Sequence, residues 1–175
     1  GRVFDNTAFG TGVDGRTFWN PANVGNYYVA FGNNTKASGD VSFAAGINTV
    51  ASGTNSTALG GGTQATGQAA TSFGSGSVSG ADYATAGGEN STATAQHATA
   101  SGDAVTADGI AATAFGSETT ASGRAATALG SETEATGSRS TAIGFGGTAS
   151  GVYALATGNA TEATGDASTA LGSVT

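Results

Sequence analysis

The chain has 175 residues, including 31 glycines, one proline and no cysteine, and only 10% of its residues are charged. Its formal net charge of −7, with five scattered basic residues, argues against a nucleic-acid-binding surface. No apolar run is long enough to span a bilayer and no secretory signal is recognisable, so we expect this stretch to make no contact with a membrane.

The first 24 residues predict an N-terminal coil with a projecting loop at 11–24. A strand ending in "TAFG" (7–10) is followed by the next glycine in phase, Gly25, after fifteen residues instead of seven. The loop carries Phe18 and Trp19, and Tyr27 with Tyr28 follow it. Two interpretations stay open: these aromatic residues anchor a partner, or they fold back to cap the stack or meet a neighbouring domain.

From residue 25 to 175 glycines recur every seven residues, and alternate heptads differ, so the repeat unit has fourteen residues. One half reads "RAATALG" (124–130) and the other "SETEATG" (131–137). A coiled coil is excluded because glycine costs about 1 kcal/mol at each helical position and the apolar a/d stripe is missing. Two short strands per unit, each ended by a glycine-centred turn with positive φ, predict an all-β parallel solenoid.

Side-chain alternation in the first half of the unit separates two faces of a strand. Bulky residues on one face predict the interior of the solenoid, and where one is small the residue two positions earlier replaces it, as Phe43 does for Ala45. In the second half the inward positions are small, as in Thr119 with Ala121 and Thr133 with Ala135. The predicted interior residues are Phe31, Phe43, Leu59, Phe73, Phe115, Leu129, Ile143, Leu155 and Leu171.

The opposite face of the same strand carries alanine and serine and no charge. Because ordering fourteen residues costs on the order of 20 kcal/mol and one buried Leu or Phe returns only about 1.5–3, further burial between subunits is expected. We therefore predict an obligate oligomer in which this face meets the neighbouring subunits. Its residues are Ser56, Ala58, Ala112, Ala114, Ala126, Ala128, Ser140, Ala142, Ser168 and Ala170.

Glycine spacing becomes irregular at 75–101, where bulky residues are also scarce. The single histidine of the chain, His97, is interpreted as a turn residue rather than a metal or catalytic group. The sequence predicts no cofactor, no metal site and no catalytic residues.

Repeats such as "STALGGGTQATG" (56–67), "ATALGSETEATG" (126–137) and "STAIGFGGTASG" (140–151) resemble the head repeats of trimeric autotransporter adhesins, the YadA-like group. The family motif is roughly Ser-Val-Ala-Ile-Gly, and "STAIG" at 140–144 has Thr141 where valine is usual. The resemblance implies a left-handed parallel β-roll, a homotrimer, and a single head domain over 1–175. It also implies a bacterial cell-surface protein, anchored in the outer membrane through regions outside this chain, which attaches without enzymatic activity to host cells, matrix proteins or other bacteria.

Two other functions remain open at this stage. The chain could be a structural spacer of the same fibre, or, more remotely, an ice-binding solenoid. The chain ends inside a repeat, "LGSVT", so we expect it to be a piece of a longer protein.

Overall fold

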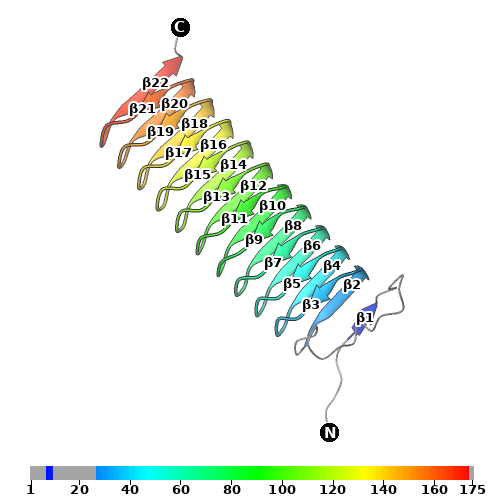
Figure 1. The fold of residues 1–175 in the computed structure, drawn as a ribbon. Helices are drawn as coiled ribbons and strands as arrows, with labels where there is room; N and C mark the ends of the chain where they lie inside the picture. Colours follow the sequence, from blue (N-terminus) through cyan, green and yellow to red (C-terminus); the bar gives the residue numbers. More distant parts are fainter. Residues whose placement is uncertain (1–6, 10–26, 174–175) are drawn as a thin grey trace.

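The computed structural model describes residues 7–9 and 27–173, which form a rod of stacked coils made of two parallel β-sheets (Figure 1). The expected loop at 11–24, with Phe18 and Trp19, lies outside the described residues. Within the described residues, no helix is long and apolar enough to cross a membrane. The predicted all-β parallel solenoid is confirmed.

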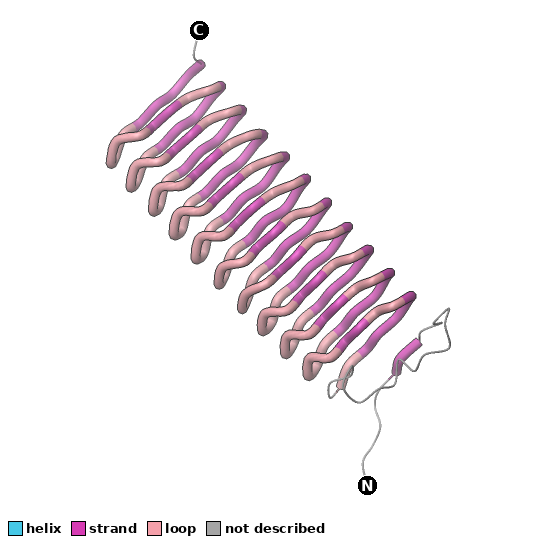
Figure 2. The backbone as a smooth tube through the Cα atoms, in the orientation of Figure 1, coloured by secondary structure: helices cyan, strands magenta, loops and turns pink. Residues whose placement is uncertain are grey.

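Ten coils each contribute one longer strand to one sheet and one two-residue strand to the other, with turns between them (Figure 2). One further strand at each end of the rod brings the first sheet to twelve strands, while the second has ten. The longer strands are β1 (Thr7–Phe9), β2 (Val29–Asn33), β4 (Phe43–Ile47), β6 (Thr57–Gly61), β8 (Thr71–Ser75), β10 (Thr85–Glu89), β12 (Thr99–Asp103), β14 (Thr113–Ser117), β16 (Thr127–Ser131), β18 (Thr141–Phe145), β20 (Leu155–Asn159) and β22 (Thr169–Ser173). The short strands are β3 (Lys36–Ala37), β5 (Val50–Ala51), β7 (Gln64–Ala65), β9 (Val78–Ser79), β11 (Thr92–Ala93), β13 (Thr106–Ala107), β15 (Thr120–Ala121), β17 (Glu134–Ala135), β19 (Thr148–Ala149) and β21 (Glu162–Ala163).

The register confirms the fourteen-residue unit, because Thr113 pairs with Thr127 and Thr127 with Thr141. The one exception is at the N-terminal end, where Thr7 pairs with Val29, eight residues further along than the repeat requires. These eight additional residues correspond to the insertion that the sequence analysis places in the loop at 11–24.

The irregularity expected at 75–101 is absent from the strand register. Thr85 pairs with Thr71 on one side and with Thr99 on the other, so the period runs through unbroken. What changes is the residue type at one position of the repeat. Gly67 is followed at the equivalent position of the next two coils by Ala81 and Ala95. The spacing of glycines was therefore a poorer guide here than the spacing of strands.

Glycine is required for close stacking of the coils more than for the turns themselves. A Cβ at Gly130, whose φ is +129°, would overlap the carbonyl oxygen of Gly144 in the next coil, and Gly53 meets Gly67 in the same way without a positive φ. The left-handed positions of the turns are instead occupied mostly by other residues, such as Val41 and Asn55, at φ between 49° and 60°. Glycine does supply a positive φ beside the turns after the longer strands, where Gly32 and its equivalents through Gly172 have φ between 101° and 142°, but the expectation is wrong for the turns after the short strands.

The interior consists of columns of alanine, serine and threonine and is only one small side chain thick. The Ser79 hydroxyl in β9 donates to the Thr71 carbonyl in β8 at 2.6 Å, so a single serine spans the two layers. The Thr49 hydroxyl likewise donates to the Gly60 carbonyl at 2.8 Å. The inward positions predicted in the second half of the unit, Thr119 with Ala121 and Thr133 with Ala135, are confirmed as fully buried.

The assignment of faces in the first half of the unit is wrong, because the bulky residues point outward. Layers bridged by one serine are closer than the usual sheet separation of about 10 Å, so phenylalanine or leucine has no room between them. Of the residues predicted inside, Leu129 and Leu155 are half-buried and the others are exposed: Phe31, Phe43, Leu59, Phe73, Phe115, Ile143 and Leu171.

The face predicted to meet other subunits is correspondingly inside the roll. Its side chains are small enough for the thin interior, and they pack against the second sheet of the same chain. Ser56, Ala58, Ala112, Ala114, Ala126, Ala128, Ser140 and Ala142 are buried in this way, and Ser168 and Ala170 hold the same columns half-buried in the last coil.

Candidate functional site

Large apolar side chains gather on the outer face of the twelve-stranded sheet, and we call this surface the apolar stripe. Phe31, Leu59, Phe73 and Phe115 are 58%, 37%, 41% and 42% exposed. Because these positions recur every fourteen residues in a parallel register, they form one column along the rod rather than scattered points. The stripe comprises Val29, Phe31, Phe43, Leu59, Phe73, Phe115, Leu129, Ile143, Leu155 and Leu171.

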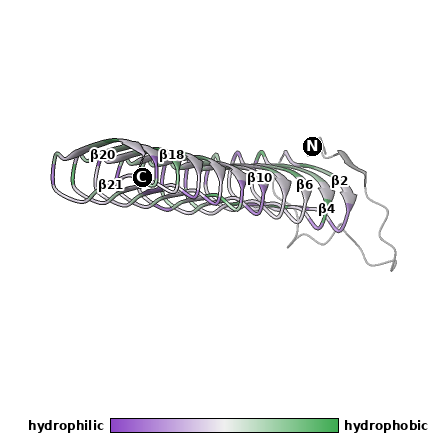
Figure 3. Ribbon diagram, turned by 90° about the horizontal axis from the view of Figure 1, so that it is seen from above, coloured by the Kyte–Doolittle hydropathy of each residue, from purple (hydrophilic) through white to green (hydrophobic). Residues whose placement is uncertain are grey.

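As the sequence predicts, a large side chain two positions earlier in the strand replaces a small one, but these residues lie on the outer face of the roll. Phe43 is bulky where Ala45 is small, and both lie outward on β4. Around β10, Gly87 is buried because the ring of Phe73 lies against the space where its Cβ would stand. Seen from above, neither layer is uniformly apolar, since hydrophobic and hydrophilic segments alternate along the rod (Figure 3).

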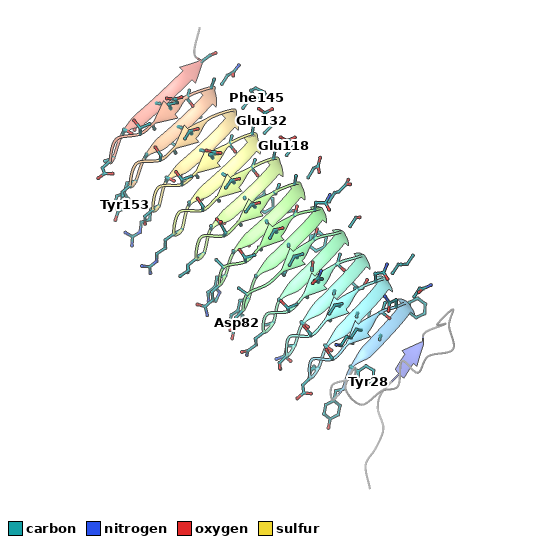
Figure 4. The ribbon with its side chains drawn as sticks, in the orientation of Figure 1. Tyr28, Asp82, Glu118, Glu132, Phe145 and Tyr153 are labelled. Carbon is teal, nitrogen blue, oxygen red and sulfur yellow. The ribbon has the colours of Figure 1, made fainter. Side chains whose placement is uncertain are left out.

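The two turns of each coil form two edges of the rod. Edge 1 holds the last residue of each longer strand and the turn that follows it, and includes Glu118, Glu132 and Phe145. Edge 2 holds the turns that follow the short strands and includes Asp82 and Tyr153. Figure 4 shows these two groups on opposite sides of the stack.

Edge 2 is a ladder in which side chains of successive coils contact one another. The rings of Tyr83 and His97 stack with centroids 4.9 Å apart and 8° between their planes. Arg139 donates to the Tyr153 hydroxyl, and its guanidinium carbon lies 5.3 Å from the centre of that ring. Asp82 accepts a hydrogen bond from the Gln68 backbone N–H at 2.8 Å. Exposed aromatic and cationic groups are thus held in fixed positions.

Edge 1 is acidic over its middle portion. Glu89, Asp103, Glu118 and Glu132 come from four successive coils, and all four are exposed. Towards the N-terminal end the edge is neutral, with the Asn34 amide donating to the Asn48 side-chain oxygen at 2.7 Å. Phe145 ends the acidic portion and is 51% exposed.

The aromatic residues expected near the N-terminal loop lie in different environments. Tyr28 is buried among Ala37, Ala44 and their neighbours, at the N-terminal end of an interior column, and burial raises its pKa. Tyr27 is exposed at a left-handed turn position. The burial of Tyr28 fits the capping interpretation, while Phe18 and Trp19 are not described.

His97 lies in an exposed turn at φ 60°, as expected, and stacks on Tyr83. The described residues contain no group of three or more His, Asp or Glu side chains that could hold a metal ion. The sequence analysis did not predict either edge. The signal that could have indicated edge 2 is the spacing of fourteen residues, one repeat unit, between Tyr83 and His97 and between Arg139 and Tyr153.

Comparison with known proteins gives one family. A model described as the YadA head domain repeat matches residues 29–49, 42–63, 51–77, 107–133, 121–146 and 149–174, together more than half of the chain. No curated protein matches the chain.

Proposed function

Because the chain belongs to the YadA head domain family, a family of non-enzymatic adhesin domains, we propose that it is a head segment of a trimeric autotransporter adhesin. It attaches its bacterium to host cells, extracellular-matrix proteins or other bacteria by binding alone. The protein is displayed at the cell surface and is anchored in the outer membrane by other regions of the same polypeptide.

The observation that carries the proposal is the apolar stripe. Soluble monomers rarely expose a contiguous apolar surface that runs along a whole molecule, and such surfaces mark interfaces. The stripe here extends from Phe31 to Leu171 on one face of one sheet and is interrupted only at β10 and β12, where Gly87 and Ser101 hold its positions. We infer a homotrimer, because three copies that turn their stripes towards a common axis would cover this surface and the adhesins of this family assemble as trimers.

This arrangement keeps the expected oligomer but changes the surface that is buried between subunits, from the alanine and serine face to the apolar stripe. The alanine and serine columns are already buried within each roll, and the burial that is still missing is that of Phe and Leu. The outer face of the ten-stranded sheet, which includes Thr120 and Glu134, then faces the ligand.

Sedimentation equilibrium tests the assembly. The wild-type chain is expected to be a trimer at micromolar concentration. Phe115→Glu on β14 should abolish the trimer, because three carboxylates would be buried near the axis without partners. Thr120→Glu, in the same coil but on the outer face of β15, should leave the trimer intact. A wild-type monomer, or a trimer that tolerates Phe115→Glu, contradicts the proposal.

Attachment needs a separate assay. Beads coated with saturating amounts of the trimer should bind host cells or immobilised matrix proteins above the level of uncoated beads. A folded trimer that binds none of them, while the full-length protein does, would make this segment a spacer within the fibre.

A further inference from the structure

We propose that edge 1 of each subunit packs against edge 2 of the neighbouring subunit, coil against coil, with ion pairs Glu118–Arg124 and Glu132–Arg139 between chains. This proposal rests on the homotrimer proposed above and names the contacts that close it. The partner is therefore a second copy of this chain, in a fixed vertical register.

The geometry follows from threefold symmetry. When three flat rolls turn the same face towards one axis, each corner of the triangle brings edge 1 of one copy to edge 2 of the next, because rotation does not exchange the two edges. Rotation also keeps each coil at its own height. Within one coil the two edges differ in height by less than the coil spacing of about 4.8 Å, a distance that an arginine side chain spans.

Three successive coils have edges of complementary chemistry. Coil 113–126 places Glu118 on edge 1 and Arg124 on edge 2. Coil 127–140 places Glu132 at the same position of edge 1, and Arg139 on edge 2 one position later in the turn than Arg124. In coil 141–154 both edges become apolar, with Phe145 on edge 1 and Val152 with Tyr153 on edge 2, at 51%, 38% and 57% exposure. The change from charged to apolar thus occurs on both edges at the same level.

One coil away, coil 99–112 brings Asp103 to Ile110, which is not a matched pair. The complementarity is therefore specific to the levels from 113 to 154, which is what a register-setting contact requires. Shifting one subunit by several coils would place Glu118 and Glu132 opposite neutral or acidic turns.

These pairs cannot form within one chain. Glu118 and Arg124 lie on opposite edges, at the two ends of the segment that contains β15, whose six residues would span about 20 Å if fully extended. All four charged side chains are exposed, and the structure gives none of them an ion pair within the described residues. Arg139 donates to the Tyr153 hydroxyl, and its guanidinium carries further N–H groups that can reach a carboxylate.

Disulfide trapping tests the pairing, because the chain has no cysteine of its own. The 175-residue chain carrying Glu132→Cys with Arg139→Cys is oxidised and run on a non-reducing gel. A disulfide needs Cα atoms within about 7 Å, so a bond can form only between neighbouring subunits at a corner. We expect the band to shift from monomer to covalent trimer, and the same shift for Glu118→Cys with Arg124→Cys.

The matched control combines Arg139→Cys with Glu134→Cys, which moves one thiol two residues along the same coil onto the outer face of the ten-stranded sheet. It should stay monomeric on the gel. Sedimentation of the unoxidised proteins separates the two proposals. A trimer by mass that does not cross-link, or that cross-links equally in the control, overturns the edge pairing and leaves the homotrimer standing. A monomer overturns both.

Charge exchange provides a second readout that does not depend on thiols. Arg124→Glu and Glu118→Arg should each lower the denaturant concentration at which half of the trimer has dissociated. The double variant should recover the wild-type value, because the ion pair is restored with its signs exchanged. Losses that simply add in the double variant would overturn the pairing.

Discussion

Gly130 shows how little room one coil leaves for the next. Its φ of +129° is one that residues with a side chain rarely adopt. A Cβ at this position would also overlap the carbonyl oxygen of Gly144. We expect Gly130→Ala to lower the free energy of unfolding in urea by about 2–4 kcal/mol, from backbone strain and overpacking together. At Gly61, a Cβ would meet nothing within 4 Å. Gly61→Ala should therefore change stability by no more than about 0.5 kcal/mol, and equal losses at both sites would refute this explanation.

Buried hydroxyls of the interior make a second prediction at the scale of the residue. The Thr119 hydroxyl is buried without a hydrogen-bond partner, and Val105 already fills the same column one coil earlier. Replacing Thr119 by valine should therefore stabilise the fold by about 1 kcal/mol.

The matched control is Thr49, whose hydroxyl donates to the Gly60 carbonyl. Thr49→Val should destabilise by about 1 kcal/mol, because the carbonyl loses its donor. Thermal unfolding of the two variants measures both changes, and changes of the same sign would show that these hydroxyls do not decide stability.

At the scale of the element, the turns of edge 2 store conformational strain. Val41 holds a left-handed position at φ 56° although it is β-branched, and Asn55 holds the equivalent position one coil later at φ 60°. Asparagine tolerates this conformation far better than valine does. Val41 is 54% exposed, so little apolar burial is lost when it is replaced.

We therefore expect Val41→Asn to raise the free energy of unfolding by about 1 kcal/mol, and Asn55→Val to lower it by a similar amount. Chemical denaturation of the two reciprocal variants measures this difference. If neither variant changed the free energy of unfolding, the turns of edge 2 would hold no conformational strain and this explanation would be wrong.

For the strands, the sequence predicted more than for the turns. The fourteen-residue unit, two strands per coil and the parallel pairing follow from repetition and from alternation, and all are confirmed. The turns after the short strands were misassigned, because glycines there, such as Gly53, have no positive φ and are required by close stacking instead, whereas Gly130 meets both requirements. Spacing alone does not distinguish these two causes.

At the scale of the whole molecule, every coil pairs with its neighbours in the same register, so one coil can be removed without altering the rest. Deletion of residues 99–112 should give a folded protein with an unchanged β-type circular dichroism spectrum per residue and slightly lower stability. Deletion of residues 106–112 alone should prevent cooperative folding, because it places short-strand sequence opposite long-strand sequence. Equal tolerance of the two deletions would contradict the fourteen-residue unit.

The faces of the roll were the part that the sequence could not decide. Alternation separated Leu59 from Ala58, but the rule that large side chains go inside assumes an interior of ordinary thickness. The hydrogen bond from Ser79 to Thr71, which shows that the interior is thin, depends on how two strands approach in space. The edges were missed for a related reason, since contacts such as Tyr83 with His97 require knowing that both residues occupy the same turn position.

The strands run across the rod while their backbone hydrogen bonds run along it. A pull on the two ends therefore stretches those bonds along their own direction, and adjacent coils separate one after another instead of sliding past each other. If the proposed attachment and homotrimer hold, a bacterium tethered under flow would load the rod in this peeling mode, and the mechanical strength of the tether would depend on how firmly the three rods are joined side by side.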